Sequence, residues 1–491
     1  PSRKQAFMTV VPVAPRDLTW LLMDRPNNLM YVHGVMWLAQ PPDWDAVEAV
    51  VQERLVDRFP VFGRRATEID GEWFWEDDPD FDLAHQVRRV TLPAPGDQDQ
   101  AQEYLSKRFA EPFDLAHPLW EIDLVDGVDG DQSMVFARFH HGIADGVRLV
   151  QVLLSMLDPI GEQPAAPAAV GRSGKPGGPV GMVTGAAKGI ASGAADFVSG
   201  VGSAVKKAPS ALGGVPQALT QGWIGLREPT RITDAVSQMA SEDNMLVNSW
   251  RSVSRLTLSG GSVDTVWSGT VGVEKNVAWV SGLSLTEVRD IAKAHTVTIN
   301  DVMLSAVSLG VTNYLQSRGE ENVDQISWLI PISLKAIDTE LPKELGNHFA
   351  VVMLPMPLGI RDPHTLLGTM HSRMNRIKNS AEPMMLYGVQ RMVAETPAAI
   401  SVRLTNFVAN KTVGQITNVP GPRVPMALAG TEVTGILGWV PCSGNQPLGL
   451  CIFSYNGVVN IGIASDAGLI PDPGRLAELI EQAIHELGQT V

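Results

Sequence analysis

The sequence predicts an α/β protein with two mixed halves joined by a crossing segment of different composition. Helical and strand-like patterns alternate in residues 1–158 and again in residues 263–491, whereas residues 159–262 are rich in Gly, Ala, Pro and Ser. At 491 residues and 44% hydrophobic content, the chain has enough apolar residues for more than one core. Two halves of comparable size suggest a pseudo-two-fold arrangement.

The N-terminal half mixes both kinds of element. Apolar residues at helical spacing predict helices over 16–24 and 44–59. Strand-like apolar runs cover 29–39 and 133–141. We therefore expect an α/β domain here.

The C-terminal half begins with a helix-start signal. Ser284 and Glu287 have the spacing of a capping box, in which each side chain bonds to the other's backbone N–H. A second helix is predicted over 298–319 and ends at Gly319. An amphipathic helix over 473–487 completes this half.

The uncharged run from Val433 to Ser465 is long enough to raise the question of a membrane span. Two prolines and several glycines interrupt it, which a spanning helix tolerates poorly. Inside the run, Asn456-Gly457 separates two apolar segments, and this dipeptide is a strong β-hairpin signal. We expect two paired strands there.

Two interpretations of the crossing segment, residues 159–262, remain open. Its Gly and Pro content is typical of a flexible tether that cannot bury enough apolar surface to fold alone. An apolar stripe flanked by lysines is instead typical of a helix that lies on a membrane surface. The stripe consists of Val183, Ile190, Ala194, Phe197, Val201 and Val205, with Lys188, Lys206 and Lys207 beside it.

Charge and cysteine content exclude some classes of function. A formal net charge of -15 argues against nucleic acid as a partner, because phosphate binding needs dense positive charge. Cys442 and Cys451 are the two cysteines, with no zinc-ligand spacing, so we expect no disulfide framework and a reducing compartment. The first residues lack the apolar core of a signal peptide, so export is not expected.

The stretch FARFHHGIADGVRLV, residues 136–150, contains the adjacent histidines His140 and His141. Because side chains alternate along a strand, the two rings point to opposite sides. His141 falls on the face without a charged neighbour, where desolvation keeps the ring neutral near pH 7. A neutral imidazole accepts a proton, which makes His141 the better candidate for a general base.

The residues that follow predict a turn into a helix over 147–158. The strand ends at Gly142, and Asp145 then lies where a carboxylate caps free N–H groups at a helix start. We expect Asp145 to fix the turn that holds His141, and Gly146 to let the backbone pass close. The predicted buried stripe of the helix consists of Val147, Val150, Leu154 and Leu157.

Three other roles for the histidines were compared with that of a base. A shared metal ion is disfavoured because rings on opposite strand faces cannot reach one ion without a bulge. A serine-hydrolase triad is disfavoured because the sequence has no GxSxG elbow. On pattern alone, a buried histidine bonded to a backbone carbonyl explains the stretch as well as a general base does.

HHGIADG, residues 140–146, resembles the HHxxxDG motif of coenzyme A-dependent acyltransferases, and most closely that of the bacterial wax ester synthase/diacylglycerol acyltransferase family. The resemblance continues in family order over nearly the whole chain from about Asp17, with residues 159–262 least similar. Its other segments are Pro118-Leu119-Trp120 (PLW), Asn300-Asp301 (ND), LIPISLK at 329–335, GNHF at 346–349 and ITNVPGP at 416–422.

The resemblance implies two chloramphenicol-acetyltransferase-like domains that face each other across a tunnel. It implies acyl transfer from acyl-CoA to diacylglycerol, giving triacylglycerol, or to a long-chain alcohol, giving a wax ester. His141 would act as the base, with His140, Asp145 and Gly146 as its supports. No metal and no cofactor are expected, since acyl-CoA is itself a substrate. We expect a cytoplasmic protein that associates peripherally with the inner membrane or lipid droplets.

Further residues have expected roles in this picture. Asn300 is expected to orient His141 or the acyl carbonyl, whereas ordinary helix capping explains Asp301. Trp120 is expected in the core or in the tunnel wall beside the substrate. His117 and His348 are expected to be structural.

A basic cluster is needed for the phosphates of coenzyme A. The segment 371–411 is locally positive in an acidic chain, and Arg373 and Arg376 are its candidates for this role. A solvated helix face explains any one of these cations better than a phosphate site does, and only the cluster as a group indicates the nucleotide end.

Two rival functions also remain. One is a condensation-type acyltransferase with a different acceptor, and the other is a non-catalytic lipid-binding protein of the same fold. An intact His141 with Asp145 and Gly146 argues against the second rival, because a binding protein needs no base in a desolvated site.

Overall fold

The computed structural model describes residues 9–161, 264–333, 341–378 and 396–489, and the single positions 386, 390 and 393. The predictions for the crossing segment lie outside the described residues from position 162 onward. The described residues on both sides of that segment belong to one compact unit. Contacts between the two halves are therefore part of the structure.

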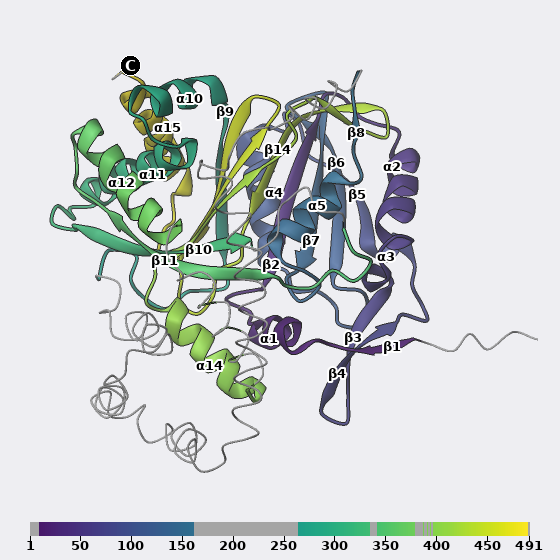
Figure 1. Cartoon of the computed structure of the whole chain (residues 1–491). Helices are drawn as coiled ribbons and strands as arrows, with labels where there is room; N and C mark the ends of the chain where they lie inside the picture. Colours follow the sequence, from purple (N-terminus) through teal and green to yellow (C-terminus); the bar gives the residue numbers. More distant parts are fainter. Residues whose placement is uncertain are drawn as a thin grey trace, which may run out of the picture. The chain divides into compact units, whose positions relative to one another are not determined.

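The N-terminal half is built on a sheet that the C-terminal half completes (Figure 1). Strand β14 pairs antiparallel with β2, which places Trp439 opposite His33. Among the described residues the sheet has seven strands, in the order β5 (Val87–Thr91), β6 (Trp120–Val128), β7 (Gln132–His140), β2 (Tyr31–Leu38), β14 (Thr431–Trp439), β13 (Met426–Leu428) and β8 (Asp158–Pro159). The predicted strands at 29–39 and 133–141 are confirmed as β2 and β7.

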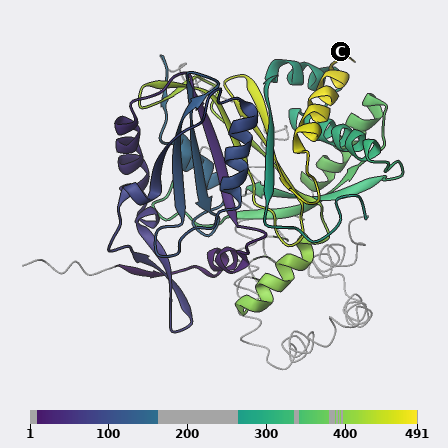
Figure 2. The same ribbon diagram turned by 180° about the vertical axis from the view of Figure 1, so that it is seen from behind.

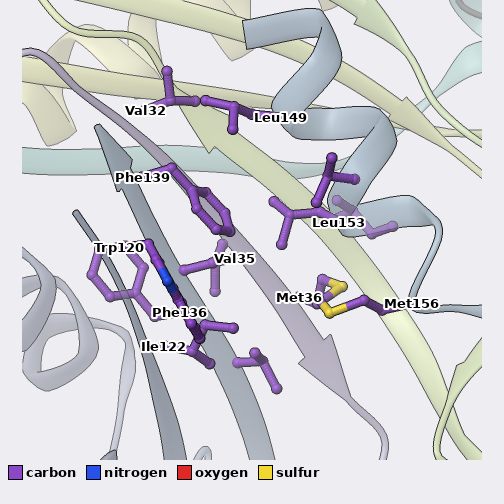
Figure 3. Close-up of a cluster of buried hydrophobic side chains, with 14 of the residues drawn as sticks. Val32, Val35, Met36, Trp120, Ile122, Phe136, Phe139, Leu149, Leu153 and Met156 are labelled. Atoms are coloured by element: carbon purple, nitrogen blue, oxygen red, sulfur yellow. The ribbon is translucent and has the colours of Figure 1, made fainter. Parts of the chain in front are cut away.

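Helix α5 (Gly146–Leu154) packs on this sheet, and Figure 3 shows Leu149 beside Val32 and Leu153 facing Phe139, while Met156, just past the helix end, lies beside Met36. Of the predicted stripe, Leu157 is buried in the core, and Val150 and Leu154 pack against it while partly buried. The buried apolar residues of the helix are instead Leu149, Val152 and Leu153. The helix is apolar on two sides, so periodicity alone does not tell which side meets the sheet. The packing on the sheet shows that the side with Leu149 and Leu153 faces inward.

The C-terminal half has its own sheet and core. Its described strands follow the order β11 (Phe349–Pro357), β10 (Gln325–Ser333), β12 (Gly414–Pro420), β15 (Leu448–Tyr455), β16 (Val458–Asp466) and β9 (Lys275–Ser284). The helices α10 (Leu285–Ala294), α11 (Ile299–Ser317), α12 (Pro363–Lys378) and α15 (Pro473–Gly488) lie beside this sheet (Figure 1). Figure 2 shows the same arrangement from behind.

Three sequence signals in this half are confirmed. The Ser284 hydroxyl accepts a hydrogen bond from the Glu287 N–H at 3.2 Å, which starts α10. Strands β15 and β16 form the predicted hairpin, with Asn456 and Gly457 at φ of 45° and 82° in its turn. Gly319, with φ of 87°, follows the end of α11. Within the described ranges, no helix is both long and apolar enough to span a membrane.

The remaining described elements lie around the first sheet. The predicted helix over 44–59 is α2 (Trp44–Val51) followed by a π-helical turn, Gln52–Val56, and a 3₁₀ turn begins at position 60. A small sheet pairs β1 (Val10–Pro12), β4 (Glu72–Asp77) and β3 (Arg64–Ile69), and two further helices are α3 (Leu83–Gln86) and α4 (Gln98–Phe109).

Helix α1 (Pro15–Met23) confirms the prediction over 16–24 and packs against α14 (Ala398–Ala409) of the C-terminal half. The hydroxyls of Thr19 and Ser401 lie 3.2 Å apart between these two helices. This contact is a second place, after the shared sheet, where the halves meet.

Candidate active site

The turn between β7 and α5 holds both histidines. Strand β7 ends at His140, and Asp145 is the N-cap of α5, where its Oδ1 accepts a hydrogen bond from the Arg148 N–H at 2.9 Å. The predicted capping role of Asp145 is therefore confirmed. Burial raises the pKa of Asp145, while the backbone N–H groups of Arg148 and His348 lower it.

The two glycines of the turn have roles that differ from the prediction. A Cβ added at Gly146 would meet no atom within 4 Å, so the expected close backbone approach there was wrong. A Cβ at Gly142 would instead lie 2.9 Å from Nδ1 of His140 and 3.1 Å from the Leu21 side chain. The tight position is at the start of the turn, where the chain folds back over His140.

His140 uses both of its ring nitrogens. Its Nδ1 accepts a hydrogen bond from the Gly142 N–H at 2.8 Å, which places the ring proton on Nε2. Nε2 lies 3.3 Å from a carboxylate oxygen of Asp24, the expected acceptor of that proton. Asp24 also accepts a hydrogen bond from the Met30 N–H. His140 thus holds the turn in place and has no nitrogen left for a substrate.

His141 has a different environment. Its ring stacks on Trp20 of α1 with 4.0 Å between centroids, and Phe349 of β11 lies 5.6 Å away. The residue is 7% exposed and its Nδ1 is buried, where its own backbone and the Asn347 side chain both act to raise the pKa of the ring. Desolvation lowers the pKa of His141 from 6.5 to about 3, so the ring is neutral at pH 7 as the sequence predicted.

A loop of the C-terminal half, residues 346–348, docks on this turn. Gly346 forms a β-bridge with Ala144, and the His348 N–H donates to Oδ2 of Asp145 at 2.8 Å. The Asn347 side chain donates to the His141 carbonyl oxygen at 3.0 Å. His348 therefore has a structural contact through its backbone, as expected.

Sequence reasoning missed four residues of the site: Asp17, Trp20, Asn347 and Phe349. The GNHF segment carries part of the family resemblance, which predicts no role for its asparagine. The one signal in the sequence that could have indicated a role for Asn347 is its position as a polar residue just before a strand. Trp20 and Asp17 lie on a helix more than 120 residues before His141, so neither periodicity nor spacing could bring them to it.

The predicted substrate-side residues lie elsewhere. Trp120 begins β6, is fully buried, and its Nε1 donates to the Phe62 carbonyl at 2.8 Å, which gives it the contacts of a core residue. Asn300 lies in the first turn of α11, and its Oδ1 accepts a hydrogen bond from the Asn418 side chain at 3.0 Å. The described contacts of Asn300 are thus with the NVPGP segment.

Asp301 and the basic cluster also have defined contacts. Asp301 forms a capping box with Thr298, as predicted, and its Oδ2 lies 2.7 Å from Nδ1 of His371. Arg373 on α12 donates to Gln325 at 3.0 Å and to the Pro355 carbonyl. Desolvation and the neighbouring Arg376 lower the pKa of Arg373.

A cleft of about 720 Å³ lies between α4 and the starts of β9 and α15. None of the predicted site residues lines it, and charged side chains such as Glu103, Lys107 and Arg475 do. The cleft is therefore not the tunnel that the resemblance implies, and that tunnel remains a prediction.

The residues described above carry the motifs of one family. The sequence profile of the wax ester synthase/diacylglycerol acyltransferase catalytic domain matches residues 13–303, and that of the WS/DGAT C-terminal domain matches residues 345–488. The chain belongs to this family. It is an acyltransferase, and the site around His141 lies within the matched catalytic domain.

Relatives and solved structures agree with membership of the wax ester synthase/diacylglycerol acyltransferase family. A probable diacylglycerol O-acyltransferase of Mycobacterium tuberculosis is 26% identical over 428 residues, which cover 84% of this chain and 81% of that protein. A wax ester synthase/diacylglycerol acyltransferase from Marinobacter aquaeolei has a TM-score of 0.65 at 18% identity, over 98% of this chain and 99% of that one.

The first condensation domain of a calcium-dependent antibiotic synthetase has a TM-score of 0.58 at 10% identity, over 98% of each chain. At such identities these likenesses show the fold alone. They confirm the predicted α/β fold of the chloramphenicol-acetyltransferase type.

Proposed function

We propose that this acyltransferase moves the acyl group of an acyl-CoA to the hydroxyl of diacylglycerol, of a long-chain alcohol, or of both, with His141 as general base. The observation that carries the proposal is the state of the His141 ring. It is neutral, desolvated and stacked on Trp20 with Phe349 beside both rings, while its neighbour His140 has both nitrogens occupied.

The reaction then proceeds as direct transfer. Nδ1 of His141 is sealed from solvent, which leaves Nε2 as the nitrogen that faces an acceptor. Nε2 takes the hydroxyl proton as the acceptor oxygen attacks the thioester carbonyl, the C–S bond breaks, and the imidazolium returns the proton to the departing coenzyme A thiolate. Because desolvation makes the ring a weak base, proton transfer is expected to accompany the attack rather than precede it.

The test is acyl transfer from labelled palmitoyl-CoA by the purified protein. Dioleoylglycerol, hexadecanol and hexadecylamine are each supplied alone, and the His141→Ala variant is compared with His485→Ala, which changes an exposed histidine. We expect ester formation that His141→Ala abolishes and His485→Ala retains. Normal turnover by His141→Ala would contradict the proposed base. Transfer to the amine only, or to nothing, would favour the condensation-type or the lipid-binding rival.

For the coenzyme A end, we propose Arg373 and Arg376 as phosphate ligands. Burial and the neighbouring Arg376 both lower the pKa of Arg373, and a bound phosphate would stabilise the charge of Arg373 against both effects. Charge reversal at both positions is expected to raise the KM for palmitoyl-CoA. Arg289→Glu, at an exposed arginine of α10, serves as the control. An unchanged KM would remove these two residues from the site.

We also propose that the protein binds a lipid surface through α14. Leu404 and Phe407 on this helix are large apolar side chains that are 36% and 42% exposed. Arg403 is exposed beside them, and the Lys411 ammonium lies 5.0 Å from the Phe407 ring centroid. Apolar side chains flanked by cations suit an anionic membrane or droplet surface.

The position of α14 supports this role, because the helix packs on α1, which also carries Trp20. Flotation with phosphatidylglycerol vesicles tests it. Leu404→Ser with Phe407→Ser is expected to reduce vesicle binding, whereas Leu115→Ser with Val273→Ser, at apolar positions that are more exposed, is not. Equal binding by both double variants would contradict the proposed surface.

A further inference from the structure

The side chain of Asn347 has a fixed orientation. Its Nδ2 donates to Oδ1 of Asp17 at 2.9 Å and to the carbonyl oxygen of His141 at 3.0 Å. Both acceptors are oxygens, so the amide nitrogen is assigned unambiguously and both of its hydrogens are used. The Asn347 backbone N–H also donates to Oδ1 of Asp17, at 3.2 Å. At 5% exposure, the residue is buried within this network.

Helix α1 links this network to the His141 ring. Asp17 and Trp20 are three residues apart on α1, which places them on the same face of the helix. Trp20 stacks on the ring of His141, while Asp17 accepts the hydrogen bonds of Asn347. The ring and the main chain of His141 are therefore held by neighbouring positions of one helix, the main chain through Asn347.

We propose that Asn347 is a positioning residue for His141, whose single amide group ties the His141 carbonyl oxygen to the Asp17 carboxylate. It thereby keeps the His141 ring on Trp20 with Nε2 directed to the acceptor hydroxyl. This inference rests on the proposed role of His141 as the base. Asn347 acts through His141 and does not itself take part in the chemistry.

Two further observations support a functional role over simple packing. Nδ1 of His141 and Oδ1 of Asn347 are both buried. The Asn347 side chain also acts on the His141 ring directly, because its hydrogen bond favours the protonated ring and raises the pKa of His141 against the larger effect of burial. Burial also raises the pKa of Asp17 to about 6, an effect that the hydrogen bonds from Asn347 oppose. Asn347 thus helps to keep a buried carboxylate charged beside the turn.

The test measures kcat and the palmitoyl-CoA KM separately. Asn347→Ala is expected to lower kcat by about 10- to 100-fold with little change in KM, because a small displacement of a catalytic group has effects of that size. Asn347→Asp keeps the shape of the side chain but removes both donor hydrogens, and we expect a similar loss of kcat. Asp17→Asn keeps an oxygen acceptor for Asn347 and is expected to retain most of the activity, whereas Asp17→Ala is not.

The matched control is Asn460→Ala. Asn460 is also buried, at 3% exposure, and it donates to the Ile436 carbonyl at 3.0 Å and accepts from the Gly282 N–H at 3.2 Å. A purely structural role for Asn347 predicts that both alanine variants lose stability and keep their kcat, and that result would overturn the proposal.

If Asn347→Ala fails to fold, Asp17→Ala decides the question alone. It removes one side of the same network at a less buried position, and an unchanged kcat would refute the proposal. The outcomes also separate this inference from the proposed base. Full turnover by His141→Ala refutes both, whereas an inactive His141→Ala with a fully active Asn347→Ala refutes only the positioning role.

Discussion

Replacing His141 by glutamine should change how the stability of the protein depends on pH. Burial lowers the pKa of His141 from 6.5 to about 3. As pH falls below 6.5, the unfolded chain binds a proton at this ring and the folded chain does not, so folding becomes less favourable until pH 3 is reached. Between pH 7 and pH 5 this single group costs the folded state about 2 kcal/mol, from 1.4 kcal/mol per unit.

Urea unfolding followed by tryptophan fluorescence at pH 7 and pH 5 measures this difference. Wild type and His141→Gln both also lose stability at low pH through other groups, including the buried His33. The measured quantity is therefore the free energy of unfolding of the wild type minus that of His141→Gln at each pH. We expect this difference to fall by about 2 kcal/mol on going to pH 5. His485→Gln, at an exposed position with no such burial, is the control. A difference that is the same at both pH values would refute a neutral, desolvated His141.

Other predictions concern packing, capping and the thiols. Gly310→Ala should destabilise the fold by about 1 to 3 kcal/mol, because its Cβ would lie 2.9 Å from the Ile480 backbone. Gly368→Ala on helix α12 should instead stabilise the fold by about 0.5 to 1 kcal/mol, because its Cβ would meet nothing within 4 Å. Thermal unfolding of the two variants measures whether each one lowers or raises the stability. Asp145→Ala removes acceptors for two backbone N–H groups and should cost about 1 to 2 kcal/mol, with Asp145→Asn intermediate, as measured by urea unfolding. Burial raises the pKa of Cys442 and Cys451 to about 12, so iodoacetamide at pH 8 should label neither thiol before unfolding and both after it, by mass spectrometry.

Much of the fold was predictable because its signals are local. The Ser284 cap, the Asn456-Gly457 turn and the Asp145 cap each depend on residues within a few positions of one another, and all three are present, although only the Ser284 half of the predicted capping box forms. The sequence did not predict which of two similarly apolar faces of a helix is buried. Helix α5 is apolar on two sides, and only the sheet beneath it shows that Leu149 faces inward.

The site was predictable only along its own strand and turn. Alternation separated His140 from His141, and desolvation explained the neutral ring of His141. The residues that hold His141 come from α1 and from the loop at 346–348, far away in the sequence. Their contacts depend on how the halves pack, and the sequence contains no periodic signal for that packing. The prediction for Gly146 was wrong for a related reason. A motif shows that a glycine is present, but not which atoms a side chain at that position would meet.

The shared sheet also affects how the chain is made. Strand β2 pairs with β14, and the partners Leu38 and Val433 are 395 residues apart in the chain. At about 5 to 20 residues per second, one edge of β2 waits on the order of 20 to 80 seconds on the ribosome before its partner is synthesised. An unpaired edge of that kind is a template for association with other chains. The nascent protein is therefore exposed to aggregation until nearly the whole chain has emerged, and slowing its translation should lower the soluble yield.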